Sequence, residues 1–245
     1  EENNTAYIVM ELLQGISLSE YISNNGGKID VEFATMIVNE VGNALNSLHK
    51  EGITHCDVAP DNIFLCNGKE IKVKLMDLGA AKLKDSSTDV IDIILKPGYS
   101  PAEQYDNSKN IGPWTDIYSL GVLLHQMLTG NPPYDTTTMT EHDIYKHVVE
   151  DELPRMKTYY KYVSDKVQAI VDKATNKKAE ARYQSCQDFK KALHNAIYPE
   201  RISKGMKAVI ITIAAIIVCG TAFLWDYNRV KVSYYKDYVE QWSIP

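Results

Sequence analysis

The sequence predicts a mainly α-helical domain with small β-hairpins, followed by one transmembrane helix. Phe33, Ile37 and Val41 recur at helical spacing within residues 31–50, so this segment is expected to be an amphipathic helix with one buried face. A second helix opens at Trp114 and is so apolar that it should lie inside the core. Residues 208–225 run for roughly 18 positions without a charge, enough to cross a hydrocarbon core of about 30 Å.

Composition narrows the class of protein. The chain has 245 residues, of which 44% are hydrophobic, as in a globular protein of one large or two small domains. The net charge of -6 and the lack of a basic stripe argue against nucleic acid as a partner. The four cysteines lack C-x-x-C spacing, which favours reduced structural thiols over a metal site or a disulfide. Because the chain begins at Glu1 without Met or a signal peptide, we expect truncation at the front.

The first elements follow in chain order. Residues 5–13 are apolar with aromatic and β-branched side chains, which predicts a buried strand running into a turn at Gly15. Capping character at Ser17 predicts the start of a short helix, and residues 24–28 are a loop rich in Asn and Gly. Asp30 is a plausible N-cap for a helix over residues 31–50 that Gly52 ends.

Two loops then carry residues that suit one chemistry. The stretch HCDVAPDN occupies residues 55–62, and a second loop opens at Asp77 after an alternating run. Asp57 can accept a proton from a hydroxyl nucleophile. Asn62 and Asp77 offer hard oxygen ligands for Mg²⁺ on a nucleoside triphosphate. Taken alone, an H-x-D followed by Asn is as often a chance loop.

These loops resemble the catalytic loop (HRDxxxxN) and the metal loop (DFG) of protein kinases. KPGYSPAEQY at residues 96–105 resembles the segment that positions the protein substrate and the end of the activation segment in bacterial Ser/Thr kinases. The helix that contains Asp116 matches the family's D-x-[WY]-S-x-G helix, and RYQS at residues 182–185 matches its R-[FY]-x-[ST] box. The resemblance covers about residues 5–197, with the motifs in family order.

The resemblance implies a nucleotide site that uses ATP and Mg²⁺. Asp57 would be the base that orients the substrate hydroxyl, while Asn62 and Asp77 would bind Mg²⁺. The resemblance also implies four contacts to adenine. Met10 would be the gatekeeper side chain, the backbones of Glu11 and Leu13 in the hinge would face the adenine, and Phe64 would form the floor beneath it.

Four further residues would be structural in the family. His55 could be a base or a ligand in isolation, but the resemblance makes it a brace for the loop backbone. Asp116 would hold the backbone of the catalytic loop, although a carboxylate there could also simply cap its helix. Glu103 and Arg182 would form a buried ion pair.

The sequence departs from the family pattern at several positions. Cys56 and Ala59 stand where the family usually has Arg and Lys, and Leu78 replaces Phe. Lys96 stands where the family has Thr, so we expect it to supply the missing positive charge at the γ-phosphate from across the cleft. The alternative is that Lys96 faces solvent. Residues 84–89 are polar and rich in hydroxyls, typical of a mobile loop that can be phosphorylated.

The expected organisation has four parts. Residues 1–198 would be a kinase domain with the hinge strand and C-lobe. The sequence shows no Gly-rich loop, strand lysine or helix glutamate. We therefore expect the N-lobe to be missing and this chain alone to be inactive. Residues 199–205 would be a juxtamembrane linker and 206–225 a transmembrane helix flanked by interfacial anchors, with a buried core helix as the alternative. Residues 226–245 would be an extracytoplasmic tail, which we expect to be truncated.

Together these features predict a single-pass membrane Ser/Thr kinase of bacterial type, a signalling transferase acting on protein hydroxyls. Since ATP is cytoplasmic, the kinase side should be inside. Nucleic acid is not expected as a partner, and a homodimer stays open. Two alternatives remain: a pseudokinase that binds nucleotide or scaffolds partners, and a membrane sensor whose outer part carries the specific role.

Overall fold

The computed structural model describes residues 9–68, 70–83, 95–106, 110–132, 134, 137–199, 212–213, 215–222, 224–226 and 229. The chain divides into two compact units, residues 1–199 and 200–245. The helices and strands of the first unit are β1 (Gly15–Ser17), α1 (Leu18–Asn24), α2 (Val31–Lys50), β2 (Ile53–Thr54), η1 (Pro60–Asn62), β3 (Ile63–Cys66), β4 (Lys72–Leu75), β5 (Lys82–Leu83), α3 (Ala102–Tyr105), α4 (Pro113–Thr129), α5 (Glu141–Glu150), η2 (Met156–Thr158), α6 (Asp165–Ala174), η3 (Ala179–Ala181) and α7 (Cys186–Ile197).

Side-chain caps set the start of the first two helices. The Ser17 hydroxyl accepts from the backbone N–H of Glu20 at 3.1 Å, so α1 begins at the next residue. The Asp30 carboxylate accepts from two backbone N–H groups at the start of α2, at 2.9 and 3.0 Å. Helix α2 runs over residues 31–50, as the sequence predicts, and Gly52 follows it with a φ of 72°.

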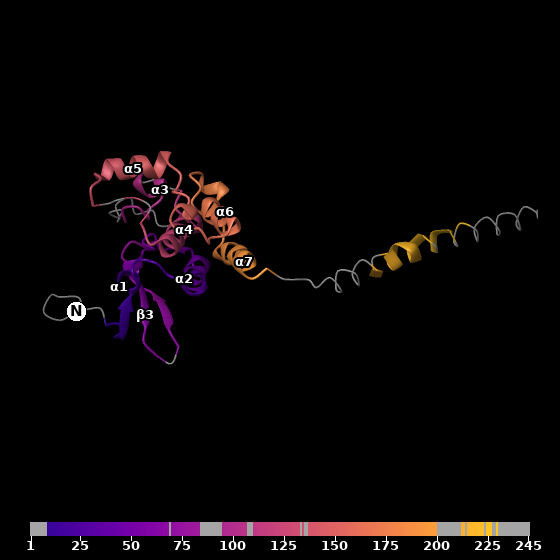
Figure 1. Ribbon diagram of the computed structural model, residues 1–245, viewed down its shortest axis with the longest axis horizontal. Coiled ribbons are helices and arrows are strands. Elements are labelled where there is room, and N and C mark those ends of the chain that lie inside the picture. The colour runs from indigo at the N-terminus through magenta and orange to yellow at the C-terminus, as the bar shows by residue number, and fades with distance from the viewer. Residues whose placement is uncertain are drawn as a thin grey trace, which may run out of the picture. The chain divides into compact units, whose positions relative to one another are not determined.

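Helix α4 lies at the centre of the core. Nearly all of its side chains are buried, and it packs against α2, α6 and α7 (Figure 1). Gly130 ends α4 in the left-handed conformation with a φ of 79°, where glycine meets no steric penalty. The mainly α-helical fold with small hairpins is therefore as expected from the sequence.

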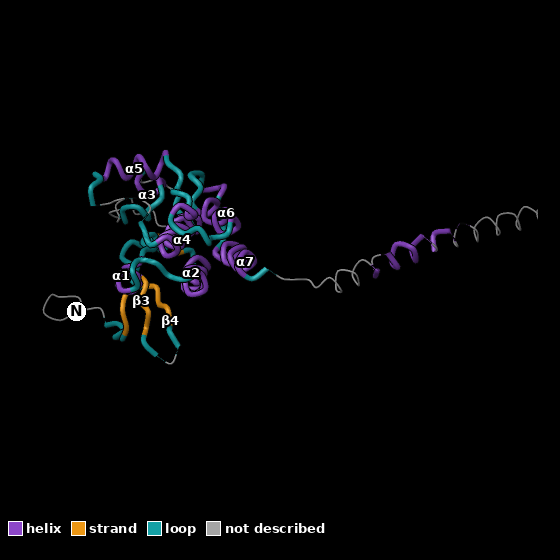
Figure 2. The backbone as a smooth tube through the Cα atoms, in the orientation of Figure 1, coloured by secondary structure: helices purple, strands orange, loops and turns teal. Residues whose placement is uncertain are grey.

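Two small antiparallel sheets accompany the helices. Strands β1, β3 and β4 form one sheet in the order β1-β3-β4, seen beside α1 and α2 in Figure 2. In its register Ser17 lies opposite Phe64, and Ile63 lies opposite Leu75. Strands β2 and β5 form the second sheet, with Ile53 opposite Leu83. The catalytic-loop stretch, residues 55–62, therefore lies between strands of the two sheets.

The buried strand expected at residues 5–13 is wrong where the structure describes it. Residues 9–13 have no strand structure, and Val9, Met10 and Leu12 are exposed. A strand needs a hydrogen-bonded neighbour, and the sheet described here starts only at Gly15. Residues 5–8 lie outside the described residues.

The second unit is described only in part. Residues 212–213, 215–222, 224–226 and 229 are helical. Among the residues that the structure describes, no helix is both long enough and apolar enough to cross a membrane. Residues 206–211, 214 and 223 of the expected span lie outside that set, as do nearly all of the expected tail.

Candidate active site

The loop at residues 55–62 is held by one buried carboxylate. Asp116, in the first turn of α4, accepts from the backbone N–H of His55 at 2.9 Å and of Cys56 at 2.8 Å. It also contacts His49 Nε2 at 2.7 Å. Asp116 is fully buried, and a buried carboxylate needs such partners. Asp116 therefore lies where the resemblance placed it, at the backbone of the loop.

Cys56 occupies a strained position in this loop. Its φ is 65°, a left-handed conformation that is uncommon for a residue other than glycine. Its carbonyl oxygen accepts from Gln104 Nε2 at 2.8 Å, and its thiol is buried. Burial, aided by the negative charge of Asp116, raises the pKa of the thiol well above its usual range. The thiol therefore stays protonated and unreactive.

His55 braces the loop through both ring nitrogens. Its Nδ1 accepts from the backbone N–H of Asp57 at 3.2 Å, so the ring proton lies on Nε2, which donates to the carbonyl of Met76 at 3.1 Å. The ring is buried and has no free nitrogen for proton transfer. Of the readings open from the sequence, this geometry fits a brace.

Asp57 has one carboxylate oxygen engaged and one open. Asn62 Nδ2 donates to Asp57 Oδ2 at 2.7 Å and to the Asp57 carbonyl at 3.0 Å, which fixes the carboxylate. Oδ1 is buried and has no hydrogen-bond partner within the part of the chain that the structure describes. A buried acceptor without a donor is costly, so a hydroxyl donor here would be well placed.

Met76, the residue before Asp77, connects the Asp77 loop to the catalytic loop through its backbone. The backbone N–H of Met76 donates to the Asn62 carbonyl at 2.8 Å, while its carbonyl accepts from His55. Asp77 then takes a φ of 62°, and its Oδ1 accepts from the N–H of Gly79 at 2.8 Å. Its side chain is exposed.

The donor set fits Mg²⁺. Asn62 and Asp77 contribute an amide and a carboxylate, and hard oxygen atoms are the ligands that this ion prefers when phosphate and water complete its shell. Over the described ranges there is no group of three or more His, Cys, Asp or Glu side chains that could hold a metal ion without such help.

The four expected adenine contacts lie in residues 9–13 and on β3. Met10 is 77% exposed, and the Glu11 carboxylate pairs with Lys74 of β4. Leu13 is half-buried. Phe64 is half-buried on β3, opposite Ser17. Residues 9–13 precede β1, which pairs with the strand that carries Phe64. The assignment of these residues to adenine stays a prediction.

The side chain of Lys96 contacts the catalytic loop, and the sequence did not suggest this contact. Its Nζ is 2.6 Å from Asp61 Oδ2. The hydrogen bond from Lys96 holds the pKa of the Asp61 carboxyl below its usual range, although burial opposes the shift. Asp61 was missed because a lone carboxylate beside Asn62 gives no signal of a partner 35 positions later.

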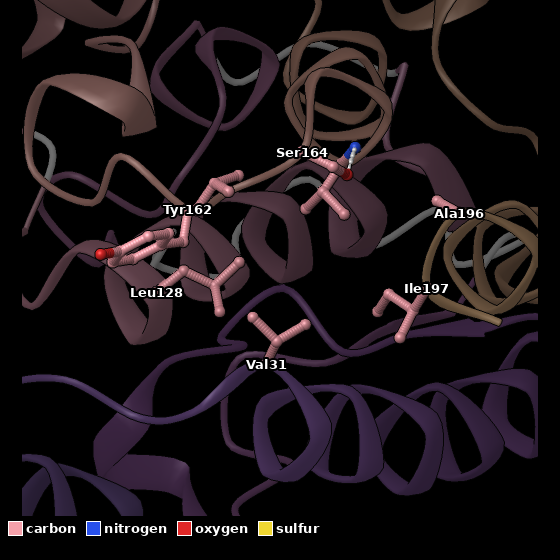
Figure 3. A pocket seen from close by; sticks show the side chains of 8 residues that line it. Val31, Leu128, Tyr162, Ser164, Ala196 and Ile197 are labelled. Atoms are coloured by element: carbon pink, nitrogen blue, oxygen red, sulfur yellow. Dashed lines mark hydrogen bonds between the residues drawn. The ribbon is translucent and has the colours of Figure 1, made fainter.

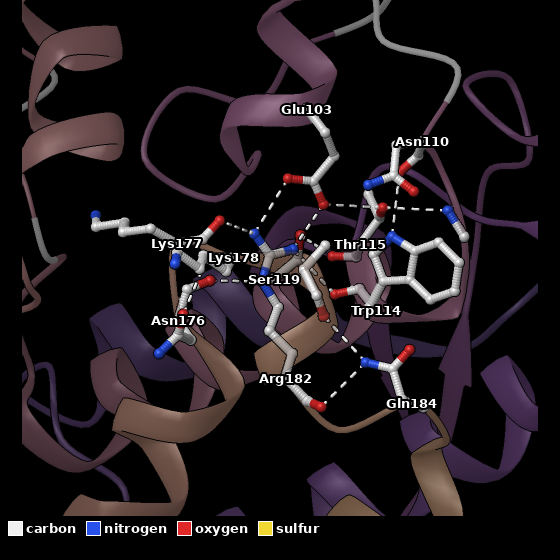
Figure 4. A network of polar contacts seen from close by, with 12 residues as sticks. Glu103, Asn110, Trp114, Thr115, Ser119, Asn176, Lys177, Lys178, Arg182 and Gln184 are labelled. Atoms are coloured by element: carbon white, nitrogen blue, oxygen red, sulfur yellow. Dashed lines mark hydrogen bonds and ion pairs between the residues drawn. The ribbon is translucent and has the colours of Figure 1, made fainter.

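Glu103 and Arg182, the pair expected from the sequence, are joined in a buried network (Figure 4). Arg182 Nη1 lies 2.6 Å from Glu103 Oε1, and Nη2 lies 3.1 Å from Oε2. The guanidinium also donates to the backbone carbonyls of Asn176, Trp114 and Lys177. Arg182 thereby fastens the segment around α3 to the region that precedes α7.

A separate cavity of about 200 Å³ lies among α2, α4, α6 and α7 (Figure 3). None of the predicted site residues lines it. Its wall is mostly apolar and includes Val31, Leu128, Tyr162, Ser164, Ala196 and Ile197. The hydroxyl of Ser164 is taken by the N–H of Val167 at the start of α6.

Comparison with known proteins points to one family. The family described as "Protein kinase domain" matches residues 1–195. Serine/threonine-protein kinase Pkn1 of Myxococcus xanthus is 33% identical over 196 residues, covering 78% of this chain and 27% of that protein. PknB of Mycobacterium tuberculosis is 33% identical over 201 residues, covering 79% of this chain and 31% of that protein. This chain thus spans about three tenths of the length of these curated relatives.

A solved structure supports the fold alone. The kinase domain of PknI from Mycobacterium tuberculosis superimposes with a TM-score of 0.61 at 21% sequence identity. The match covers 76% of this chain and 64% of the solved one.

Proposed function

The chain belongs to the protein kinase family, and from that premise we propose that it transfers the γ-phosphate of ATP to Ser and Thr hydroxyls of proteins. The observation that carries the proposal is the Asp57 carboxylate, which Asn62 fixes through Oδ2 and which keeps a buried Oδ1 without a partner among the described residues. A substrate hydroxyl that donates to Oδ1 would satisfy it. The names of the relatives, all serine/threonine-protein kinases, favour this acceptor class.

The proposed mechanism relies on placement more than on covalent chemistry. Asp57 orients the hydroxyl and accepts its proton as the new bond to the γ-phosphorus forms and the bond from that phosphorus to the departing ADP oxygen breaks. Asn62 and Asp77 would hold Mg²⁺, which neutralises charge on the phosphates when it is bound. His55 and Asp116 keep the loop backbone in place, so little reorganisation is needed during transfer.

Replacement of Asp57 by Asn tests the proposal. In the full-length protein, Asp57→Asn should lower kcat for phosphate transfer to a protein acceptor by about 10²–10⁴-fold, the usual contribution of a general base. Binding of ATP with Mg²⁺ should change little, because Asn62 and Asp77 remain. A variant that retains the parent's kcat would remove Asp57 from the reaction.

The pseudokinase alternative is favoured by the exposed Leu78 and by the uncharged Cys56 and Ala59 in the two loops. The same assay separates the two functions. A full-length protein that binds ATP but transfers no phosphate to any protein acceptor, itself included, would support the alternative.

Membrane anchoring through residues 206–225, with the kinase unit on the cytoplasmic side, is proposed from the sequence. The uncharged run supports it, and so does the need for cytoplasmic ATP. The double variant Ile213→Lys with Ile217→Lys should release the full-length protein from the membrane fraction, since a Lys at the centre of a membrane helix costs about 2.5–3.5 kcal/mol. The control Lys204→Ala should leave it there. A parent protein that stays out of the membrane fraction would overturn the proposal.

A further inference from the structure

Lys96 stands at the start of a closed turn. Its carbonyl accepts from the backbone N–H groups of Tyr99 and Ser100, each at 3.0 Å, and its own N–H donates to the Ser100 hydroxyl at 2.9 Å. Ser100 is buried. Because these bonds make the turn one unit, a contact that fixes the Lys96 side chain also restrains residues 96–100.

Neutral hydrogen bonds connect the turn and the following helix to the rest of the site. The Ser119 hydroxyl of α4 donates to the Tyr99 carbonyl at 2.9 Å. Gln104 of α3 donates to the Cys56 carbonyl at 2.8 Å. Residues 96–104 are therefore docked on both α4 and the catalytic loop.

A charged contact joins the same two parts. Asp61 lies in η1, between Asp57 and Asn62, and its carboxylate pairs with Lys96. The Asp61 side chain is 55% exposed and that of Lys96 is 31% exposed, so the pair lies at the surface of the site. Since Cys56 and Ala59 bring no cation to this loop, the charge comes from Lys96.

We propose that Asp61 is a positioning residue that, through Lys96, latches the turn at residues 96–100 to the catalytic loop. This Asp61–Lys96 latch holds in place the segment expected to receive the protein acceptor, and it needs no phosphorylated side chain to do so. The inference rests on the proposed function, because that segment has this role only in a kinase. Lys96 then acts through Asp61 rather than at the γ-phosphate.

A double-mutant cycle tests the latch in the full-length enzyme. Asp61→Asn and Lys96→Met should each lower kcat/KM for the protein acceptor by about two- to fivefold, as expected for a partly exposed pair. The double variant should be no worse than either single one, Asp61→Glu should restore most of the parent value, and the Kd for ATP should not change.

Three outcomes would overturn it. One is that the losses multiply in the double variant, and another is that Asp61→Asn equals the parent. The third is a tenfold or larger loss of kcat in Lys96→Met that Asp61→Asn does not share, which would assign Lys96 to the phosphate.

Hydrogen–deuterium exchange tests the latch without any activity. In the full-length protein, Asp61→Asn and Lys96→Met should speed exchange in peptides covering residues 95–104 and leave α2 unchanged. Lys157→Met is the matched control, because it breaks an exposed ion pair with Asp165 far along the chain. Unchanged exchange in residues 95–104 would overturn the latch. Because this result needs no phosphate transfer, it separates failure of the latch from failure of the proposed function.

Discussion

Arg182 shows at the scale of one residue how the fold accommodates a buried charge. Its side chain is 1% exposed, yet the guanidinium has a carboxylate and three backbone carbonyls as acceptors. The ring of Tyr118 lies 4.8 Å from its central carbon. With every donor engaged, the charge is tolerated because its hydration is replaced atom by atom.

Truncation of this residue should therefore be severe. Arg182→Ala leaves Glu103 buried without its counter-ion, and we expect a loss of about 3–5 kcal/mol in the free energy of unfolding, measured by urea denaturation. Arg155→Ala makes the same truncation at an exposed position and should stay within about 0.5 kcal/mol of the parent. Small, equal effects from both would mean that the pair is not buried in solution.

Lys177 provides a second test at this scale, through pH. Its ammonium donates to the carbonyl of Val148 at the end of α5, and burial lowers its pKa from 10.5 to about 8. The unfolded chain therefore binds more protons than the folded one between these values, so this residue's contribution to stability rises with pH there. Below about pH 8 both states are protonated and the penalty of burying the charge is fully present.

The Lys177→Met variant isolates this contribution. Relative to the variant, the parent should gain stability as pH rises from 8 to 10.5 and should show no such gain below pH 7. Urea unfolding of both proteins at several pH values measures the difference. A difference that stays constant over the whole range would show that Lys177 titrates normally.

At the scale of elements, α4 and the end of α6 approach each other closely at Gly121. A Cβ added at Gly121 of α4 would meet Ala174 Cβ at 2.8 Å and Thr175 Cγ2 at 3.0 Å. A Cβ added at Gly42 of α2 would meet the flexible side chain of Lys190 instead, at 2.8 Å. The two helical glycines thus differ in what surrounds them.

The paired variants Gly121→Ala and Gly42→Ala should have opposite effects. Alanine gains about 1 kcal/mol in helix propensity at either position, but at Gly121 overpacking costs about 1–3 kcal/mol because Ala174 cannot rotate away. We expect a loss of up to about 2 kcal/mol at Gly121 and a gain at Gly42, measured by thermal or urea unfolding. A gain at both sites would mean that α4 and α6 can separate without cost.

The elements also show what the sequence could predict. The bounds of α2 were predictable because Asp30, the apolar spacing and Gly52 are local signals. The strand expected over residues 5–13 was wrong at residues 9–13, because strand pairing depends on a neighbour that composition does not reveal. The Lys96 contact with Asp61 was equally invisible, since it depends on how two loops fold together.

On the scale of the whole molecule, the regulation of the proposed kinase should differ from the family pattern. The arginine that commonly pairs with a phosphorylated loop residue is replaced by Cys56, whose thiol is buried and uncharged. Replacing Ser86, Ser87 and Thr88 together with Ala, in residues outside those described, should lower activity of the full-length protein only slightly. A loss of a hundredfold or more in a protein that stays folded would contradict this.

The contacts of Asp116 also determine the stage of folding at which the protein can gain phosphate-transfer activity. Its bonds to the backbone of His55 and Cys56 join positions 61 and 60 residues apart, so this support of the loop exists only once α4 is in place. Contacts of such long sequence separation form late, because the intervening chain must first be ordered. In a refolding reaction, ATP-dependent transfer should therefore reappear only after α4 has docked on α2, and never from an early helical intermediate.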